Sequence, residues 1–219
     1  MRSKKQLLKS WKVYAVLDDS LFPDRRKLLR KFYDLLESPV DVVQFRFKDF
    51  ADLPFYRAVF DMVAAAKRKN IPLIINDRPE IALSLGADGV HLGKGDILVS
   101  AARKMLGPGA IIGRTIRGAV DIGSINRKEV DYVAVGPVFR TPLKPGLKAV
   151  SRSRLRELSR SVRMPLVAIG GINKDNVREV VREGIRTVAF ARYGITETYT
   201  RKKIEELRKA MGLTPGLLR

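Results

Sequence analysis

The stretch IPLIINDRPEIALSLGADGVHLGKGD, residues 71–96, decides the fold of this chain. An apolar run at 73–75 ends in Asn76 and Asp77, a short helical pattern follows, and a second run at 89–92 leads through GKG to Asp96. This pattern predicts a strand, a helix and a second strand, with an aspartate after each strand. Parallel strands joined by one helix are usually neighbours, so we expect both carboxylates at one sheet edge, on strands about 4.8 Å apart.

A carboxylate pair at one sheet edge has two interpretations. Mg²⁺ takes one or two carboxylates together with substrate phosphate oxygens, so Asp77 and Asp96 as metal ligands would favour a diphosphate-bearing substrate. Aspartate is also a preferred residue just before a helix, where its side chain accepts backbone N–H groups. These residues alone support a metal site and a pair of helix caps equally.

The same strand–helix unit recurs along the whole chain. Apolar runs predict strands at 11–17, 40–45, 73–75, 89–92, 110–115, 131–136, 165–169 and 187–190. Helical patterns separate them, among them 28–36, 54–66, 96–105, 118–127, 151–161 and a helix that Asn173 caps and that runs to Arg182, and a last helix carries Ile204, Leu207 and Met211. Eight such units predict a closed (β/α)₈ barrel.

An open, doubly wound sheet is the competing architecture. It usually needs fewer strands and often has a glycine-rich turn after its first strand, which this sequence lacks. The GKG and GPG triplets at 93–95 and 107–109 do not have the spacing of a dinucleotide-binding fingerprint. We therefore expect an α/β protein with a single (β/α)₈ TIM-barrel domain over residues 1–219, including an N-terminal extension at 1–10 and a C-terminal tail at 212–219.

The composition narrows the chemistry. The 219 residues include no cysteine, which excludes disulfides, thiolate nucleophiles and cysteine-ligated metals. The single histidine, His91, excludes histidine clusters, so chemistry based on electrostatics and positioning is favoured. Because His91 lies inside an apolar run, we interpret it as a structural residue rather than as a base or ligand.

The net charge of +20 is distributed widely. The 43 basic residues are scattered over most predicted helices and are not interleaved with aromatic residues, which indicates a charged solvent face and argues against a nucleic-acid groove. The basic start has no apolar run long enough for a signal peptide, and no later run reaches membrane-spanning length. We expect a cytoplasmic protein with no membrane contact, and the sequence leaves a homo-oligomer open.

Residues suited to ligand binding lie at the carboxyl ends of seven of the predicted strands, at the barrel face where functional groups usually gather. They are Gln44, Arg46 and Lys48 after the second strand, Asn76 and Asp77 after the third, Asp96 after the fourth, Thr115 after the fifth, Thr141 and Lys144 after the sixth, Gly170 and Gly171 after the seventh, and Arg192 after the eighth. Cations, hydroxyls and glycine amides around a carboxylate pair suit phosphate and Mg²⁺ binding. Each residue also has a plainer explanation, as a barrel-lining, turn or surface residue, but their convergence on one face favours a site.

Five motifs at these positions resemble the thiamine-phosphate synthases. They are QFRFK at 44–48, IIND at 74–77, ADGVHLGKGD at 87–96, DYVAVGPVFRT at 131–141 followed by Lys144, and VAIGGI at 167–172. The similarity extends from about residue 14 to residue 194. It implies a TIM barrel that joins an aminopyrimidine, hydroxymethylpyrimidine diphosphate, to a phosphoethylthiazole (thiazole phosphate) and releases diphosphate.

The resemblance also implies roles for individual residues. It assigns the pyrimidine diphosphate to Gln44, Arg46, Lys48, Asn76 and Lys144, Mg²⁺ to Asp77 and Asp96, and the thiazole phosphate to Gly170 and Gly171, with Thr115 and Thr141 nearby. Arg46, Lys48 and Lys144 would neutralise the charge that develops on the leaving diphosphate. Loss of diphosphate leaves a ring-stabilised cation, and the attacking thiazole nitrogen carries no proton, so the reaction needs no strong base.

The chain departs from the family pattern at several positions. Phe47 replaces a usual Glu, Lys94 a Gln, Thr115 with Arg117 a Ser-x-His, Leu143 a second Thr, and Arg192 a phosphate-binding Ser. These changes add positive charge and remove hydroxyl groups. Two alternatives remain: a thiazole tautomerase, although that group carries a catalytic histidine where this chain has Pro137, and a diverged, non-catalytic barrel that binds a phosphorylated ligand or nucleic acid.

Overall fold

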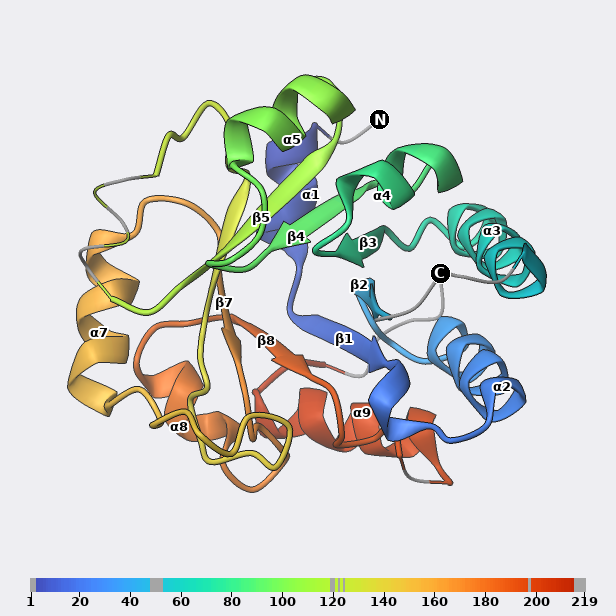
Figure 1. Ribbon diagram of the computed structural model, residues 1–219. Coiled ribbons are helices and arrows are strands. Elements are labelled where there is room, and N and C mark those ends of the chain that lie inside the picture. Colours follow the sequence, from blue (N-terminus) through green and yellow to red (C-terminus); the bar gives the residue numbers. More distant parts are fainter. Residues whose placement is uncertain are drawn as a thin grey trace.

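Eight parallel strands pair in sequence order, and the last returns to pair with the first (Figure 1). They are β1 (Val13–Asp18), β2 (Val42–Arg46), β3 (Leu73–Asn76), β4 (Gly89–Leu92), β5 (Ile111–Ile116), β6 (Tyr132–Val135), β7 (Leu166–Ile169) and β8 (Thr187–Phe190). The computed structural model describes residues 3–47, 53–118, 121, 123, 125–196 and 198–214. All eight predicted strands are present, and the predicted closed (β/α)₈ barrel is confirmed.

Helices surround the barrel, as Figure 1 shows. They are α1 (Lys4–Ser10), the short 3₁₀ helix η1 (Asp19–Leu21), α2 (Arg25–Leu36), α3 (Leu53–Arg68), α4 (Pro79–Leu85), α5 (Val99–Leu106), α7 (Arg152–Ser161), α8 (Val177–Arg182) and α9 (Thr200–Ala210). The helix predicted at 118–127 falls partly on residues outside the described ranges. Among the helices that are described, none combines the length and the apolar character that crossing a membrane requires.

Two predicted helix starts are wrong. The helix expected from residue 96 begins at Val99, because Asp96 turns back to accept the N–H of Gly93. The helix expected from Asn173 begins at Val177, because the Asn173 side chain instead accepts N–H groups within the preceding turn, from Asp175 at 2.8 Å and Asn176 at 3.2 Å. In both places, side chains expected to cap a helix close the loop before it.

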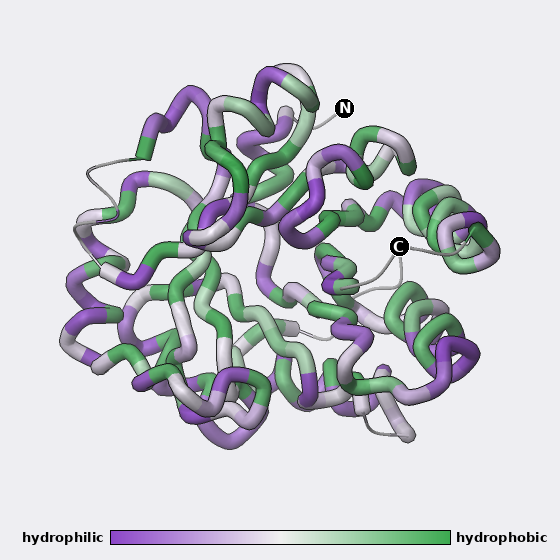
Figure 2. Tube along the Cα trace, viewed as in Figure 1, coloured by the Kyte–Doolittle hydropathy of each residue, from purple (hydrophilic) through white to green (hydrophobic). Residues whose placement is uncertain are grey.

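The strands are buried on both faces, which explains their continuous apolar runs. In β1, Tyr14 and Val16 belong to the cluster inside the barrel, whereas Val13, Ala15 and Leu17 belong to the larger cluster between the strands and the helices. Figure 2 shows hydrophobic residues along the strands and hydrophilic segments on the surrounding helices. Alternation along each strand therefore decides which polar side chains can enter the barrel.

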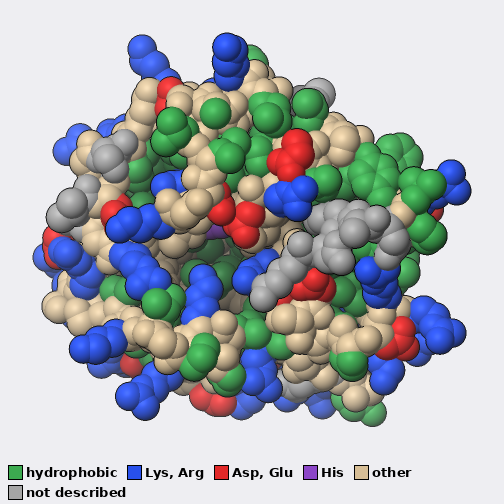
Figure 3. All heavy atoms as spheres, viewed as in Figure 1, with side chains coloured by type: hydrophobic (Ala, Val, Ile, Leu, Met, Phe, Trp, Pro, Cys, Tyr) green, Lys and Arg blue, Asp and Glu red, His purple; other side chains and the backbone are tan. Residues whose placement is uncertain are grey.

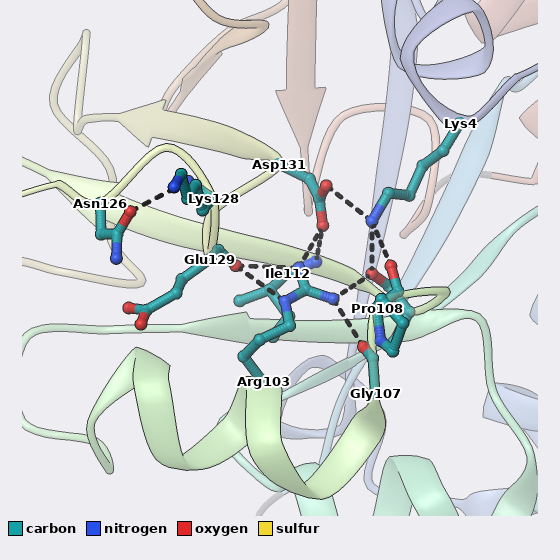
Figure 4. Close-up of polar contacts among 10 residues, drawn as sticks. Lys4, Arg103, Gly107, Pro108, Ile112, Asn126, Lys128, Glu129 and Asp131 are labelled. Carbon is teal, nitrogen blue, oxygen red and sulfur yellow. Dashed lines mark hydrogen bonds and ion pairs between the residues drawn. The ribbon is translucent and has the colours of Figure 1, made fainter.

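Helix α1, which lies in the predicted N-terminal extension at 1–10, closes the amino-terminal end of the barrel. Its Leu8 and the following Trp11 are buried in the cluster inside the barrel. At the helix start, the Lys4 ammonium contacts Asp131 at 2.8 Å and donates to the Pro108 carbonyl at 2.8 Å (Figure 4). These contacts tie α1 to the segments that lead into β5 and β6.

Asp131 is the centre of the polar contacts in Figure 4. Besides Lys4, its carboxylate accepts hydrogen bonds from Arg103 Nη2 at 2.6 Å and from the Ile112 N–H at 2.8 Å. Arg103 also donates to the carbonyls of Gly107 and Glu129. The network joins α1, α5, β5 and β6 at the end of the barrel opposite the predicted site.

Candidate functional site

The carboxyl ends of the strands surround a cavity of about 560 Å³. Figure 3 shows this hollowed face, with basic side chains around the hollow and acidic ones close to it. The cavity is lined by Gln44, Arg46, Asn76, Asp77, Asp96, Thr115, Thr141, Lys144, Gly170, Gly171 and Arg192. Every predicted site residue that the structure describes is thus brought to one cavity; Lys48 lies outside the described residues.

The two aspartates lie together at the cavity wall. Asp77 follows β3 in a left-handed conformation (φ 64°), and its N–H donates to the His91 carbonyl at 2.8 Å. The Asp96 carboxylate accepts the N–H of Gly93 at 2.5 Å. Burial and a hydrogen bond and charge contact with Asp96 raise the pKa of Asp77 to about 7, although Arg46 and Lys144 oppose this shift.

The helix-cap interpretation of this pair is not supported. The residue that precedes α4 is Arg78, and the residue that precedes α5 is Leu98; neither makes a side-chain capping hydrogen bond. Asp77 and Asp96 instead face each other, and two carboxylates in contact need a proton or a cation between them. Their arrangement is therefore explained by ligand chemistry better than by helix capping.

The carboxylate pair fits Mg²⁺ in the chemistry of its donor atoms. Both residues supply hard oxygen ligands, and the described part of the chain contains no cluster of three or more histidine, aspartate or glutamate side chains suited to a metal. A cation held by Asp77 and Asp96 would therefore complete its shell with water and substrate oxygens. This is how proteins commonly hold Mg²⁺ beside phosphate groups.

Arg46 lies beside these carboxylates, at the end of the neighbouring strand β2, and is held there by Asp18, which was not predicted as a site residue. Register pairs Asp18 with Arg46 at the ends of β1 and β2, and their side chains form an ion pair at 2.7 Å. The other oxygen of Asp18 accepts the Ser20 hydroxyl at 2.6 Å. Because Asp18 is buried and fully engaged, it fixes the direction of the guanidinium; the acid at the end of the first predicted strand was the available signal.

Lys144 enters the same group of charges from the loop after β6. Loss of hydration, followed by the charges of Arg46 and Arg117, lowers the pKa of Lys144, while Asp77 and Asp18 act in the opposite direction. The lysine thus stands among both basic and acidic groups. A bound anion at this position would satisfy Arg46 and Lys144 together.

The turn after β7 is shaped by its two glycines. Gly170 has φ 103° and Gly171 has φ 67°, conformations that residues with a side chain rarely adopt. A Cβ on Gly170 would lie 2.6 Å from Pro137 Cα, and one on Gly171 would lie 2.6 Å from the Arg140 carbonyl oxygen. Glycine is needed here because the loop after β6 packs directly on this turn.

A chain of hydrogen bonds crosses the barrel below the mouth. Gln44 Nε2 lies 2.8 Å from the Tyr14 hydroxyl, which lies 2.9 Å from the Tyr132 hydroxyl. The Tyr132 hydroxyl lies 3.0 Å from His91 Nδ1, and His91 Nε2 lies 2.9 Å from Thr115 Oγ1. All five residues line the cavity.

Burial controls the protonation of the histidine and the two tyrosines in this series of hydrogen bonds. It lowers the pKa of His91 to about 4, with a further contribution from the Lys144 charge, so the imidazole is neutral near pH 7. Burial also raises the pKa of Tyr14 and Tyr132 above the ordinary value for a phenol. Neither tyrosine was predicted as a site residue; the alternation along β1 and β6 that points them inward was the available signal.

The departures from the family pattern occupy different places. Phe47 is buried and stacks on Phe45 with ring centroids 5.1 Å apart, so it belongs to the packing around the barrel. Leu143 and Arg192 line the cavity. Lys94 and Arg117 are exposed, and Arg117 acts on the site through its charge on Lys144. The added positive charges therefore lie at or act on the cavity. The phenylalanine that replaces the usual acid at position 47 is packed in the hydrophobic core instead.

Comparisons with known proteins agree with this geometry. A sequence model of the thiamine monophosphate synthase family matches residues 13–193. The thiamine-phosphate synthase of Caldanaerobacter subterraneus subsp. tengcongensis is 34% identical over 202 residues, which cover 90% of this chain and 94% of that protein. The thiamine-phosphate synthase of Methanobrevibacter smithii is 37% identical over 173 residues, covering 79% of this chain and 82% of that protein.

A solved structure supports the same relationship. Thiamine phosphate pyrophosphorylase from Pyrococcus furiosus superposes on this chain with a TM-score of 0.82 and 30% sequence identity, covering 94% of this chain and 98% of that one. The sequence match spans the strands that carry the cavity residues, from β1 to the segment after β8. As its motifs predict, this chain belongs to the thiamine monophosphate synthase family of enzymes.

Proposed function

We propose that this protein is a transferase that joins hydroxymethylpyrimidine diphosphate to thiazole phosphate, forms thiamine phosphate and releases diphosphate in a magnesium-dependent reaction. The observation that carries the proposal is the contact between Asp77 and Asp96 in a cavity that also presents Arg46 and Lys144. Adjacent carboxylates for a cation and adjacent cations for an anion form a site for a metal-bound diphosphate.

The pyrimidine diphosphate would occupy the side of the cavity formed by β2, β3 and the loop after β6. Gln44 and Asn76 would contact the ring, and Arg46 and Lys144 would bind the diphosphate, together with Lys48 as the sequence motif implies. Asp77 and Asp96 would hold Mg²⁺, which when bound supplies charge neutralisation to the leaving diphosphate. Asp18 keeps the Arg46 guanidinium aimed at this position before substrate arrives.

The thiazole phosphate would bind across the cavity, at the Gly170–Gly171 turn. Thr115 and Thr141 line the cavity, and Arg192 supplies a cation where the family usually has a serine. A guanidinium can hold a phosphate through two parallel hydrogen bonds, which compensates for missing hydroxyl contacts. The charge added by the family departures therefore favours phosphate binding in this half of the cavity.

The reaction fits a site without a strong base. Departure of diphosphate leaves a pyrimidine cation, and the thiazole nitrogen attacks with its own lone pair. Residues that neutralise the leaving group and align the two rings are sufficient. The neutral, buried His91 is consistent with this division of roles.

The test is synthesis from purified components. The protein is incubated with both precursors and Mg²⁺, and thiamine phosphate and diphosphate are measured by chromatography. We expect equal amounts of both products, loss of synthesis with a chelator, and restoration by added Mg²⁺. Diphosphate release that is independent of the thiazole, or no product at any Mg²⁺ concentration, would contradict the proposal. Pro137 lines the cavity where thiazole tautomerases carry a catalytic histidine, so no tautomerase activity is expected.

A further inference from the structure

The hydrogen bonds that run from Gln44 to Thr115 below the cavity mouth form a chain with a donor-to-acceptor direction. Its inner members, Tyr14, Tyr132 and His91, each have one neighbour on either side, at distances of 2.8 to 3.0 Å. A hydroxyl has one hydrogen to donate, and a neutral imidazole donates from one nitrogen and accepts at the other. When every inner member uses its hydrogen for one neighbour and accepts from the other, the series of hydrogen bonds can point in only two directions.

The two directions give the ends of the chain opposite properties. If Gln44 Nε2 donates to Tyr14, the donors continue through Tyr132 to His91 Nδ1, and His91 Nε2–H donates to Thr115. Gln44 then offers its Oε1 acceptor to the cavity, and the Thr115 hydroxyl hydrogen is free for a ligand. In the reverse direction, Gln44 offers its amide hydrogens to the cavity. The Thr115 hydroxyl then donates its hydrogen to His91 Nε2 and cannot donate it to a ligand.

The structure favours the first direction at the Gln44 end. Gln44 Nε2 faces the Tyr14 hydroxyl, and the described residues give Oε1 no hydrogen-bond donor. We propose that Tyr14, Tyr132 and His91 are positioning residues that link the two substrate halves of the cavity: an amino group donating to Gln44 Oε1 fixes His91 as the Nε2–H form and turns the Thr115 hydroxyl into a donor for phosphate. This inference rests on the proposed function, since it takes an aminopyrimidine as the ligand of Gln44.

Neighbouring side chains hold these hydrogen-bonded residues in place. Tyr14 and Tyr132 are almost completely buried, and both pack edge-on against Trp11, with ring centroids 5.8 and 5.5 Å away. A Cβ on Gly113 would lie 2.2 Å from the Tyr132 ring and 2.5 Å from His91 Nδ1. Glycine at this position on β5 therefore makes the Tyr132–His91 contact possible. Buried hydrogen bonds of this kind polarise one another, which favours one common direction.

The tautomer of His91 reports the direction. His91 is the single histidine of the chain, so in protein labelled with ¹⁵N-histidine, purified without a histidine tag, each imidazole signal belongs to it. Spectra are recorded at about pH 8 with saturating Mg²⁺ and hydroxymethylpyrimidine diphosphate, after calorimetry has established saturation. We expect a protonated Nε2 and an unprotonated Nδ1. A proton on Nδ1, or a mixture of both forms, would overturn the inference.

An analogue provides the reverse test. In the same diphosphate with an oxo group in place of the amino group, the ligand accepts where the natural one donates. Gln44 must then present Nε2 to it, and we expect His91 to change to the Nδ1–H form. The same tautomer in both saturated complexes would show that the ligand does not set the direction.

Tyr14→Phe removes the hydroxyl that links Gln44 to Tyr132 and keeps the ring that packs on Trp11. In this variant, we expect the amino and oxo ligands to leave His91 with the same tautomer distribution, and affinity for the pyrimidine diphosphate to fall about threefold to tenfold. The exposed Tyr33 on α2 gives the matched control, Tyr33→Phe, in which both ligands should still set opposite tautomers. A ligand-dependent tautomer change that survives Tyr14→Phe would contradict the relay.

The outcomes separate this inference from the proposed function. Normal synthesis and tight binding with no ligand-dependent tautomer would remove the relay and leave the synthase assignment intact. Failure of the pyrimidine diphosphate to bind in calorimetry would remove both. If Tyr14→Phe does not fold, as judged by thermal unfolding, the two wild-type complexes still decide the question.

Discussion

The carboxyl groups of Asp77 and Asp96 lie close together at the cavity wall, and burial together with this contact raises the pKa of Asp77 to about 7. In the unfolded chain, this carboxyl returns to its ordinary value near 3.8. Between these two values, the folded protein holds a proton that the unfolded chain has released. The ligand-free site is therefore a source of pH-dependent instability.

We predict that stability without Mg²⁺ falls as the pH rises from about 4 to about 7 and levels off above that value. The direction follows from linkage, because the folded state binds more protons than the unfolded state within this window. Thermal unfolding in a chelator at a series of pH values measures it. Asp77→Asn should flatten the profile and keep the left-handed backbone, which asparagine tolerates. Exposed Asp61→Asn on α3 is the control; a pH profile unchanged by Asp77→Asn would contradict the assignment.

The same substitution should separate binding from folding. We expect Asp77→Asn and Asp96→Asn each to reduce Mg²⁺-dependent synthesis by at least about a hundredfold, which corresponds to roughly 2.7 kcal/mol of transition-state stabilisation. Steady-state rates at saturating precursors, with Mg²⁺ varied, give the measurement. Folded variants that keep near-normal rates would show that the carboxylate pair is not the metal site.

Lys144→Met should weaken diphosphate binding. The ammonium group stands near Arg46, Asp77 and Asp18, as their effects on its pKa show, so a bound anion would remove an existing repulsion between Lys144 and Arg46. We expect the dissociation constant for diphosphate to rise about tenfold or more, measured by calorimetry with Mg²⁺ present. Lys148 is exposed in the same loop and does not line the cavity, so Lys148→Met should bind normally. Equal effects of both variants would indicate a general charge effect.

Gly171→Ala should destabilise the protein by roughly 2 kcal/mol, because it combines a left-handed backbone (φ 67°) with a Cβ placed 2.6 Å from a carbonyl oxygen. Chemical denaturation measures the change in the free energy of unfolding. Gly146→Ala is the control, because Gly146 lies in the loop after β6 and an added Cβ there has no atom within 4 Å. That control should be within about 0.5 kcal/mol of wild type; similar losses in both variants would contradict the packing argument.

Asp131→Asn tests the opposite end of the barrel. The change removes the charge that pairs with Arg103 and Lys4, and side chains here are only 14% exposed for Asp131 and Arg103. We expect a loss of roughly 3 kcal/mol in the free energy of unfolding. The surface pair Arg201–Glu205 provides the comparison, since Glu205→Gln should cost less than about 1 kcal/mol. Substrate affinity in folded Asp131→Asn should remain that of wild type.

The barrel and the outline of its site were predictable from the sequence. Eight apolar runs separated by helical patterns determine the closed sheet, and the residue after each run must then lie at the same face. This reasoning brought Asp77, Asp96 and Lys144 together although they are far apart in the chain. Hydrophobic burial determines where each strand runs and where it ends. Both can therefore be recognised from short stretches of sequence.

The parts that sequence reasoning missed depend on register between strands. Asp18 reaches Arg46 because β1 and β2 pair with these residues side by side, and Tyr14 reaches Tyr132 across the interior of the closed barrel. Neither relationship produces a local pattern. The late starts of α5 and α8 have a different, local cause, because the Asp96 and Asn173 side chains accept N–H groups two or three residues away and so close turns before the helices begin.

The packing of Trp11 has a practical consequence for the laboratory. This ring packs against both tyrosines of the hydrogen-bond chain and directly follows α1, and Leu8 of α1 is buried in the same cluster, so the first helix is packed against the residues below the cavity. Fusion partners or deletions that disturb α1 should alter substrate affinity from the far end of the molecule. Expression designs that leave the first eleven residues untouched will preserve the enzyme's native behaviour.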